Sequence, residues 1–198
     1  DTGTFVIEGW LALDAALATG QALASILVAA PRVDRLAELL GDRERGGEVP
    51  VLVAEPAVIA ETVGFDLHRG VVAVAARRRS PEPASLAARS RRLLVIEGVN
   101  DGENLGALFR TAAALGADGA LVDPTCHDPL SRRSIRVSLG HVLRVPWARA
   151  AEPWRLGGHT VVALTPAACA LDLREVEPAG PDRPVAVVVG AEGPGLSA

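Results

Sequence analysis

The residues most suggestive of chemistry lie on a helix-patterned segment that begins near Asn104. At 100° per residue, this segment places five apolar side chains on one face, which we expect to be buried: Leu105, Leu108, Phe109, Ala112 and Leu115. Arg110 points away from that face, with Gly106 and Ala113 on nearly the same outer side. A glycine inside a helix costs about 1 kcal/mol relative to alanine, which indicates close approach of another molecule there. Arg110 is therefore a candidate to hold a ligand or a partner subunit, and a solvated arginine is the alternative.

A second candidate is the glycine-rich turn 190–195, GAEGPG, which directly follows the apolar segment 185–189. Glycines allow backbone N–H and C=O groups to reach a ligand without intervening side chains. The turn lacks the G-x-G-x-x-G order and the acidic residue about 20 positions later that are typical of a dinucleotide site. An ordinary strand-to-helix turn has a similar sequence, so this pattern alone does not establish a ligand site.

Arginines gather in two segments of a chain whose formal net charge is −4. Segment 77–92 has six arginines against one acid, and segment 129–151 has five against none. Such clusters suit contact with a phosphate backbone, although solvated surfaces are the alternative. The candidates for nucleic-acid contact are Arg77, Arg78, Arg79, Arg132, Arg133 and Arg136.

The composition excludes several kinds of chemistry. All 20 basic residues are arginine, so a Schiff base and a phosphate-loop lysine are excluded, and the lack of tyrosine excludes a Tyr/Lys reductase pair. The two cysteines and four scattered histidines lack metal-ligand spacing, so we expect idle or buried thiols and no metal site. The longest apolar runs fall short of the roughly 18 to 20 residues that a membrane span requires, and no leader pattern is visible. We therefore expect a cytoplasmic protein.

The positions of apolar residues predict an α/β protein divided at residues 77–92. That segment contains prolines and serines without apolar periodicity, so we expect an exposed connector. Upstream, the expected elements are a helix at 8–18, a strand at 25–29, a helix at 33–40, a strand at 51–54, a helix at 56–63 and a strand at 71–75. Downstream, they are a strand at 93–97, a helix at 103–115, a strand at 120–122, an arginine-rich helix at 130–142, and strands at 160–164 and 185–189.

Strands that alternate with helices predict a parallel sheet covered on both faces. Ligands of such sheets bind beyond the carboxyl ends of the strands. The loops EGVNDGEN, LTPAA and GAEGPGLS are expected at that edge.

Four segments in order resemble one known family: ENLGALFRTAAALG at 103–116, DPLS at 128–131, RVSLG at 136–140 and VGAEGPGL at 189–196. Together they resemble the SpoU/TrmH ribose 2′-O-methyltransferases of the SPOUT class, over about residue 93 to the end. Residues 5–74 resemble, less specifically, that family's ribosomal-protein-like N-terminal domain. The resemblance implies an RNA substrate-binding domain at 1–76, an Arg-rich linker at 77–92 and a SPOUT methyltransferase domain at 93–198.

The resemblance implies a trefoil-knotted α/β domain that binds S-adenosylmethionine, acts as a homodimer and methylates RNA, with ribosomal RNA favoured over transfer RNA. It assigns Arg110, Asn104 and Glu192 to the catalytic site. Ser138 falls in the family's Arg-x-Ser-x-Gly segment without an assigned role. The cofactor-binding residues that it implies are Leu164, Thr165, Pro166, Gly190, Ala191, Glu192, Gly193, Gly195 and Leu196.

The implied reaction fits the residues present. Methyl transfer from a sulfonium requires the protein to align the reactants and to stabilise an alkoxide-like oxygen. Arg110 can do so electrostatically, because a guanidinium with a pKa above about 12 rarely loses its proton, and the general base is left open. Asn104 and Glu192 would orient Arg110 or the glycine-rich turn. In the dimer, Arg110 is expected to meet a methyl donor held by that turn.

One departure from the family pattern bears on activity. The family's third motif, an apolar stretch leading into Ser-Leu-Asn-Val and a final helix, is not reached before Ala198, so the knot would be incomplete within this segment. Because the chain also lacks methionine, we expect a sequence that continues beyond it rather than a degenerate enzyme. The alternative function is an RNA-binding module of the same fold without catalysis, and a nicotinamide-dependent oxidoreductase is a more distant one.

Overall fold

The computed structural model describes residues 3–41, 49–63, 69–151, 154, 156–176, 180, 183–193 and 195–197. The fold divides into two compact units. Unit 1 comprises Asp1–Arg78 and Leu130–Arg144, and unit 2 comprises Arg79–Pro129 and Val145–Ala198. Within the described ranges, no helix is long and apolar enough to cross a membrane.

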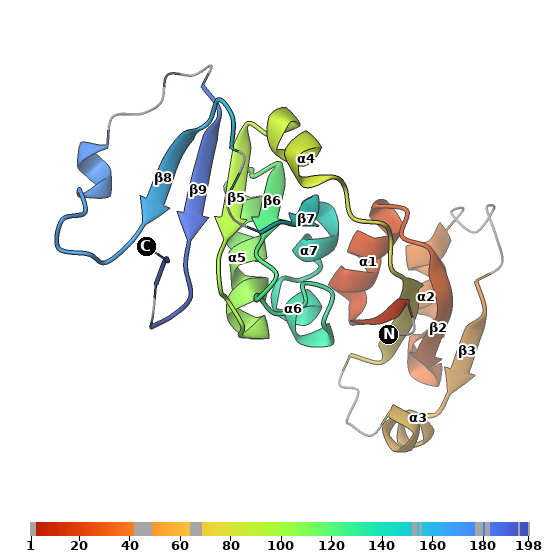
Figure 1. Ribbon diagram of the computed structural model, residues 1–198. Helices are drawn as coiled ribbons and strands as arrows, with labels where there is room; N and C mark the ends of the chain where they lie inside the picture. Colours follow the sequence, from red (N-terminus) through yellow and green to blue (C-terminus); the bar gives the residue numbers. More distant parts are fainter. Residues whose placement is uncertain are drawn as a thin grey trace. The chain divides into compact units, whose positions relative to one another are not determined.

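Unit 1 contains a four-stranded mixed sheet in the order β1-β4-β2-β3 (Figure 1). Strand β4 runs antiparallel to β1 and β2, whereas β2 and β3 are parallel. The strands are β1 (Thr4–Glu8), β2 (Leu23–Ala29), β3 (Val51–Ala54) and β4 (Val71–Ala76). The helices that follow the first three strands are α1 (Trp10–Ala18), the short η1 (Ala30–Arg32) with α2 (Val33–Leu40), and α3 (Pro56–Val63).

The helix expected at 8–18 is shorter than predicted, because the residues before it form β1. Phe5 and Ile7 are buried, and every residue of β1 pairs with β4. Gly9 then adopts a φ of 91°, which ends the strand before Trp10 starts α1. The apolar spacing of α1 therefore placed the start of the predicted helix two residues too early.

The segment Leu130–Arg144, which the sequence places in the methyltransferase domain, groups with unit 1. It forms two short helices, α6 (Arg132–Val137) and α7 (His141–Arg144), so the single helix expected at 130–142 is wrong. Leu139 and Gly140 have positive φ angles of 53° and 82°, which an α-helix does not tolerate. At Gly140, a Cβ atom would lie only 2.7 Å from the Ala15 Cβ atom, so glycine is needed for the close approach to α1.

Unit 2 contains five parallel strands in the order β7-β6-β5-β9-β8, which confirms the predicted parallel α/β sheet (Figure 1). The strands are β5 (Arg92–Ile96), β6 (Gly119–Val122), β7 (Trp147–Arg149), β8 (Thr160–Leu164) and β9 (Val185–Val189). The helices are α4 (Pro83–Arg89), α5 (Gly102–Ala114) and the short η3 (Leu173–Glu175). Because β5, β9 and β8 are consecutive in the sheet, the loops after their carboxyl ends share one edge.

Helix α4 replaces part of the exposed connector that the sequence predicts. The Glu82 carboxylate accepts hydrogen bonds from the backbone N–H groups of Ala84 and Ser85, at 3.1 and 2.6 Å, and so caps the helix. Leu86 is fully buried in the core of unit 2. The expectation missed α4 because the helix is short and its sequence resembles a loop, with a proline at its first position and serines beside it.

Candidate functional site

A hollow of about 430 Å³ lies beyond the carboxyl ends of β5 and β9. Residues of both predicted motifs line it, so we call it the motif pocket. From α5 and the loop before it come Val99, Asn104, Ala107, Leu108 and Thr111, and from the glycine-rich turn come Gly190, Ala191 and Glu192. The fold thus brings together two segments that lie nearly 80 residues apart in the sequence.

Asn104 and Glu192 meet across this pocket. The side-chain amide of Asn104 donates a hydrogen bond to Glu192 Oε2 at 3.0 Å. The start of α5 is fixed by Asp101, whose Oδ1 atom accepts hydrogen bonds from the backbone N–H groups of Glu103 and Asn104, at 2.6 and 3.0 Å. The first turn of α5 therefore presents Asn104 to the glycine-rich turn in a defined orientation.

The glycine-rich turn folds back on itself closely. At Gly190, an added Cβ atom would lie 2.4 Å from both the carbonyl carbon and oxygen of Gly195, so only glycine fits. The Gly195 N–H donates to the carbonyl oxygen of Ala191 at 3.1 Å, which closes the turn. Gly193 and Gly195 have φ angles of 95° and 75°, and open space lies where their side chains would project. The turn thus exposes bare backbone, as the sequence pattern suggested.

Glu97 is a site-edge residue that the sequence reasoning missed. Its Oε1 atom accepts a hydrogen bond from the Ser197 backbone N–H at 2.7 Å, and its own N–H donates to the Val189 carbonyl at 2.9 Å. Glu97 therefore ties the end of β5 to the chain on both sides of the glycine-rich turn. An acid at the end of an apolar strand was the available signal.

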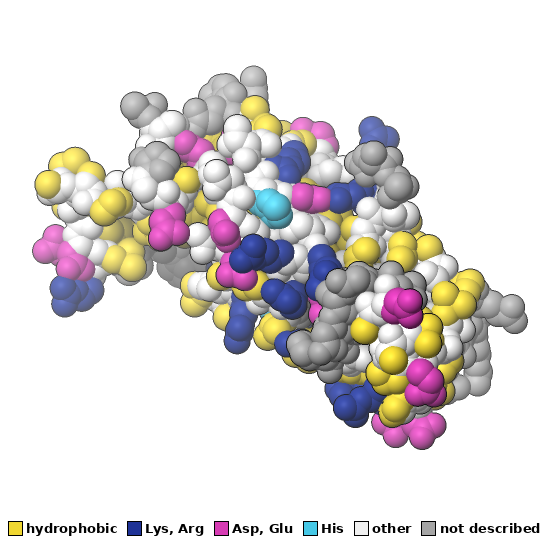
Figure 2. All heavy atoms as spheres, turned by 90° about the horizontal axis from the view of Figure 1, so that it is seen from below, with side chains coloured by type: hydrophobic (Ala, Val, Ile, Leu, Met, Phe, Trp, Pro, Cys, Tyr) yellow, Lys and Arg dark blue, Asp and Glu magenta, His cyan; other side chains and the backbone are white. Residues whose placement is uncertain are grey.

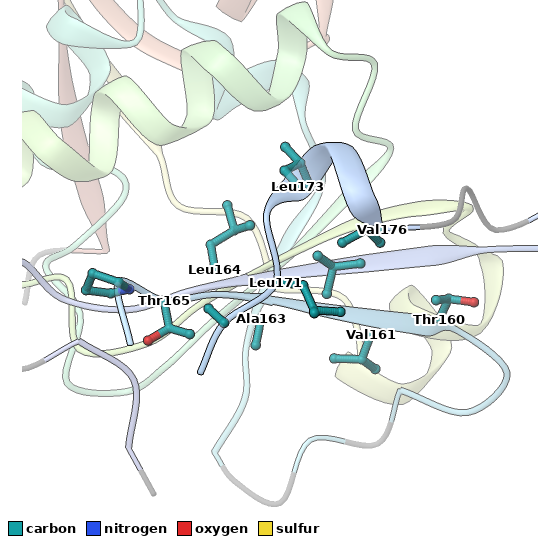
Figure 3. A pocket seen from close by; sticks show the side chains of 11 residues that line it. Thr160, Val161, Ala163, Leu164, Thr165, Leu171, Leu173 and Val176 are labelled. Carbon is teal, nitrogen blue, oxygen red and sulfur yellow. The ribbon is translucent and has the colours of Figure 1, made fainter. Parts of the chain in front are cut away.

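The predicted cofactor residues Leu164, Thr165 and Pro166 line a different hollow, of about 690 Å³, beside β8 (Figure 3). Leu173 and Val176, at η3, also border this space, which we call the β8 hollow. The Thr165 hydroxyl accepts a hydrogen bond from the Ala167 backbone N–H at 3.3 Å.

An apolar groove of about 340 Å³ has lining residues in common with both hollows. It shares Leu164 with the β8 hollow and shares Leu108 and Thr111 with the motif pocket. Of the predicted cofactor residues, Leu164 thus borders both the groove and the β8 hollow, whereas Gly190, Ala191 and Glu192 line the motif pocket.

Arg110 is exposed on α5, as predicted, but it does not line the motif pocket. It lies roughly 120° around the helix from Asn104. Within the described part of the chain, no hydrogen bond or ion pair engages its guanidinium. The helix face differs from the prediction in two places: Gly106 is buried rather than outward-facing, and Leu115 is 72% exposed because it lies just past the helix end.

The arginines proposed for nucleic-acid contact have different environments. Arg132 donates to the buried carboxylate of Glu8 at 2.6 Å, and Arg78 donates to the Thr19 carbonyl at 3.0 Å. Arg77 and Arg133 also have partners. Arg79 and Arg136 are exposed. On the face that Figure 2 draws, arginine side chains have Asp and Glu side chains beside them.

Ser138 and the cysteines lie in structural positions. The buried Ser138 hydroxyl donates to the Ile135 carbonyl at 3.0 Å and accepts from the Val142 N–H at 3.4 Å, so it stabilises the turn between α6 and α7. Cys126 is buried and Cys169 is exposed, and both are free thiols. Among the residues with described positions, no cluster of three His, Cys, Asp or Glu side chains could hold a metal ion.

Comparison with known proteins places these motifs in a family. Residues 91–198 match the model of the SpoU rRNA Methylase family. An uncharacterized tRNA/rRNA methyltransferase of Mycobacterium tuberculosis is 46% identical over 83% of this chain and 59% of its own length. An uncharacterized tRNA/rRNA methyltransferase of Synechocystis sp. is 31% identical over 99% of this chain and 71% of its own length.

Two solved structures share the fold over nearly the whole chain. The AdoMet-bound rRNA methyltransferase from Sinorhizobium meliloti is 30% identical, with a TM-score of 0.79 over 99% of this chain and 74% of the other. A crystal structure of an RNA 2′-O ribose methyltransferase is 29% identical, with a TM-score of 0.70 over 98% of this chain and 74% of the other.

The chain belongs to the SpoU rRNA methylase family, which confirms the resemblance seen in its motifs. It spans 59% of the length of the mycobacterial relative.

Proposed function

We propose that this protein transfers a methyl group from S-adenosylmethionine to a ribose 2′-hydroxyl of ribosomal or transfer RNA in the cytoplasm, with ribosomal RNA as the preferred substrate. The observation that carries the proposal is the hydrogen bond from Asn104 to Glu192 across the motif pocket of a SpoU-family chain. The AdoMet-bound Sinorhizobium relative supports the cofactor, and the related 2′-O ribose methyltransferase supports the reaction.

The residues present fit the cofactor. The open space above Gly193 and Gly195 leaves backbone groups accessible, and Val99 and Leu108 supply apolar surface. Glu192 supplies a carboxylate that suits a cationic ligand. The cofactor would be held by the turn 190–196 together with Leu164, Thr165 and Pro166. When bound, S-adenosylmethionine supplies the electrophilic methyl group.

In this proposal, Asn104 and Glu192 hold the glycine-rich turn against α5. Arg110 stabilises negative charge that develops on the attacking ribose oxygen, because a guanidinium is a permanent cation with several donors. Since Arg110 does not line the motif pocket of its own chain, it is assigned to the site of a second copy in a homodimer. The ends of Arg79 and Arg136 are available for RNA phosphates, since both side chains are exposed.

Calorimetry with S-adenosylmethionine and methyl incorporation into ribosomal and transfer RNA test the proposal. We expect cofactor binding and 2′-O-methylation by the wild type. Arg110→Lys should lose most of the turnover while keeping cofactor affinity. Arg183→Lys is the control, because Arg183 is exposed before the amino end of β9, at the opposite sheet edge.

Two outcomes would contradict the proposal. Near-normal turnover of Arg110→Lys would remove the role of Arg110. If the wild type bound RNA but not the cofactor, the alternative function would hold, and the protein would be a non-catalytic RNA-binding module.

A further inference from the structure

Arg149 is the last residue of β7, and its half-buried side chain donates hydrogen bonds to several backbone carbonyls of one turn. Its Nη1 atom donates to the carbonyl oxygens of Asp123 and Cys126, at 2.7 and 2.9 Å, and its Nη2 atom donates to that of His127, at 3.0 Å. These carbonyls all lie in the turn that follows β6, and their oxygens converge on one side. The guanidinium therefore fixes the shape of the turn 123–127.

The turn 123–127 in turn holds the loop that leads into α5. The Asp123 N–H donates to the Ile96 carbonyl at 2.9 Å, where β5 ends. Further along, the His127 N–H donates to the Val99 carbonyl at 2.9 Å, and the Val99 N–H donates to Cys126 Sγ at 3.2 Å. The backbone N–H and the backbone carbonyl of Val99 thus both have hydrogen-bond partners in this turn.

Cys126 suits this position because it stays a neutral thiol. Burial, the largest effect, raises the pKa of the Cys126 thiol above its ordinary value of 9.0. The protonated sulfur accepts from Val99 and lies 3.5 Å from the Ile96 carbonyl oxygen, to which it can donate. The thiol thereby links the turn to both ends of the loop 96–99.

Val99 is held by the hydrogen bonds of the turn 123–127 and also lines the motif pocket. Its side chain is 5% exposed, and it lines the pocket beside Asn104. Two residues later Asp101 caps α5, which sets the direction of Asn104 toward Glu192. Hydrogen bonds thus link Arg149 to the turn 123–127 and that turn to Val99, and the chain leads from Val99 directly to the Asp101 cap that orients Asn104.

We propose that Arg149 is a positioning residue of the motif pocket, which fixes Val99 and the start of α5 so that Asn104 meets Glu192. Its consequence for methyl transfer rests on the function proposed above. Lysine cannot replace it fully, because one ammonium group lacks the planar fork that reaches several carbonyls in fixed directions.

The test compares Arg149→Lys and Arg149→Gln with Arg92→Gln. Arg92 also donates to carbonyls in unit 2, those of Leu115 and Gly116, each at 3.4 Å, but at the other end of α5. Amide hydrogen exchange reports on Val99 and His127, the side-chain amide NMR signal reports on Asn104, and calorimetry gives the dissociation constant for S-adenosylmethionine. All are measured well below the unfolding temperature.

For Arg149→Gln we expect faster exchange at Val99 and His127, a shifted Asn104 signal and cofactor binding weakened by about tenfold, with a smaller loss for Arg149→Lys. Arg92→Gln should leave all three at wild-type values. Unchanged exchange and an unchanged Asn104 signal in both Arg149 variants would overturn the proposal. So would equal effects of Arg92→Gln, because Arg149 would then contribute only general stability.

Cys126→Ala keeps the proposal falsifiable if the Arg149 variants do not fold. It removes the sulfur partner of the Val99 N–H and should speed exchange there and shift the Asn104 signal in the same direction. No change at either position would contradict the proposal. If the wild type does not bind S-adenosylmethionine, that result contradicts the proposed function. The role of Arg149 is still decided by amide exchange and the Asn104 signal, which do not require the cofactor.

Discussion

The two sides of the candidate site are held in different ways. On the motif-pocket side, Val99, Asn104 and the turn 190–195 are each fixed by hydrogen bonds to neighbouring backbone or side chains. On the β8 side, Leu164 and Thr165 are exposed at the edge of the sheet, as is Leu171 in the chain that follows, at 72%. The motif-pocket side is therefore preorganised by its own hydrogen bonds, whereas the side chains on the β8 side are largely open to solvent.

The largest effect is expected from Gly190→Ala. A Cβ atom at 2.4 Å from the Gly195 carbonyl group would force the turn open, and its φ angle causes no difficulty for alanine. We expect a loss of about 2 to 3 kcal/mol in cofactor binding free energy, equal to roughly 100-fold in the dissociation constant. Calorimetry measures it. Gly157→Ala is the control, because nothing lies within 4 Å of that added Cβ. Equal affinities for both variants would mean that the turn is not preorganised.

An intermediate effect is expected from the Asn104–Glu192 pair. A double-mutant cycle with Asn104→Ala and Glu192→Ala, read out as the free energy of cofactor binding, should give a coupling of about 0.5 to 1 kcal/mol. The value is small because both side chains are exposed to water. If the binding free-energy changes of the two single variants simply add up in the double variant, the hydrogen bond does not hold the two motifs together in solution.

The smallest effect is expected on the β8 side. Thr165→Ala removes one exposed hydrogen bond, from the Ala167 N–H at 3.3 Å, so the free energy of unfolding should fall by about 0.5 kcal/mol or less. Thermal unfolding measures this change, and calorimetry should show cofactor affinity reduced by about threefold, because Thr165 supplies one exposed contact in the proposed cofactor site. A loss of roughly 100-fold, as large as that expected for Gly190→Ala, would show that the β8 side holds the cofactor as firmly as the motif-pocket side and would reverse the comparison.

Periodicity located most elements because each carries its own apolar pattern. Strands β3, β8 and β9 and helices α2 and α3 have the predicted bounds. Strands β1 and β7 and helix α4 were missed, since they are stabilised by pairing with a neighbouring strand or by packing on the sheet rather than by a distinct local pattern. Leu86, for example, is buried by contacts with the sheet that local spacing does not encode.

The sequence by itself determined the family, the parallel sheet and the identity of the two motifs, because these depend on local patterns and their order along the chain. Only the tertiary structure showed that Asn104 meets Glu192, that Arg132 pairs with Glu8 in unit 1, and that Arg149 organises the turn 123–127. The physical reason is that each of these contacts joins residues 22 or more positions apart. Such contacts are set by how strands and helices pack, and residue type and spacing do not specify them.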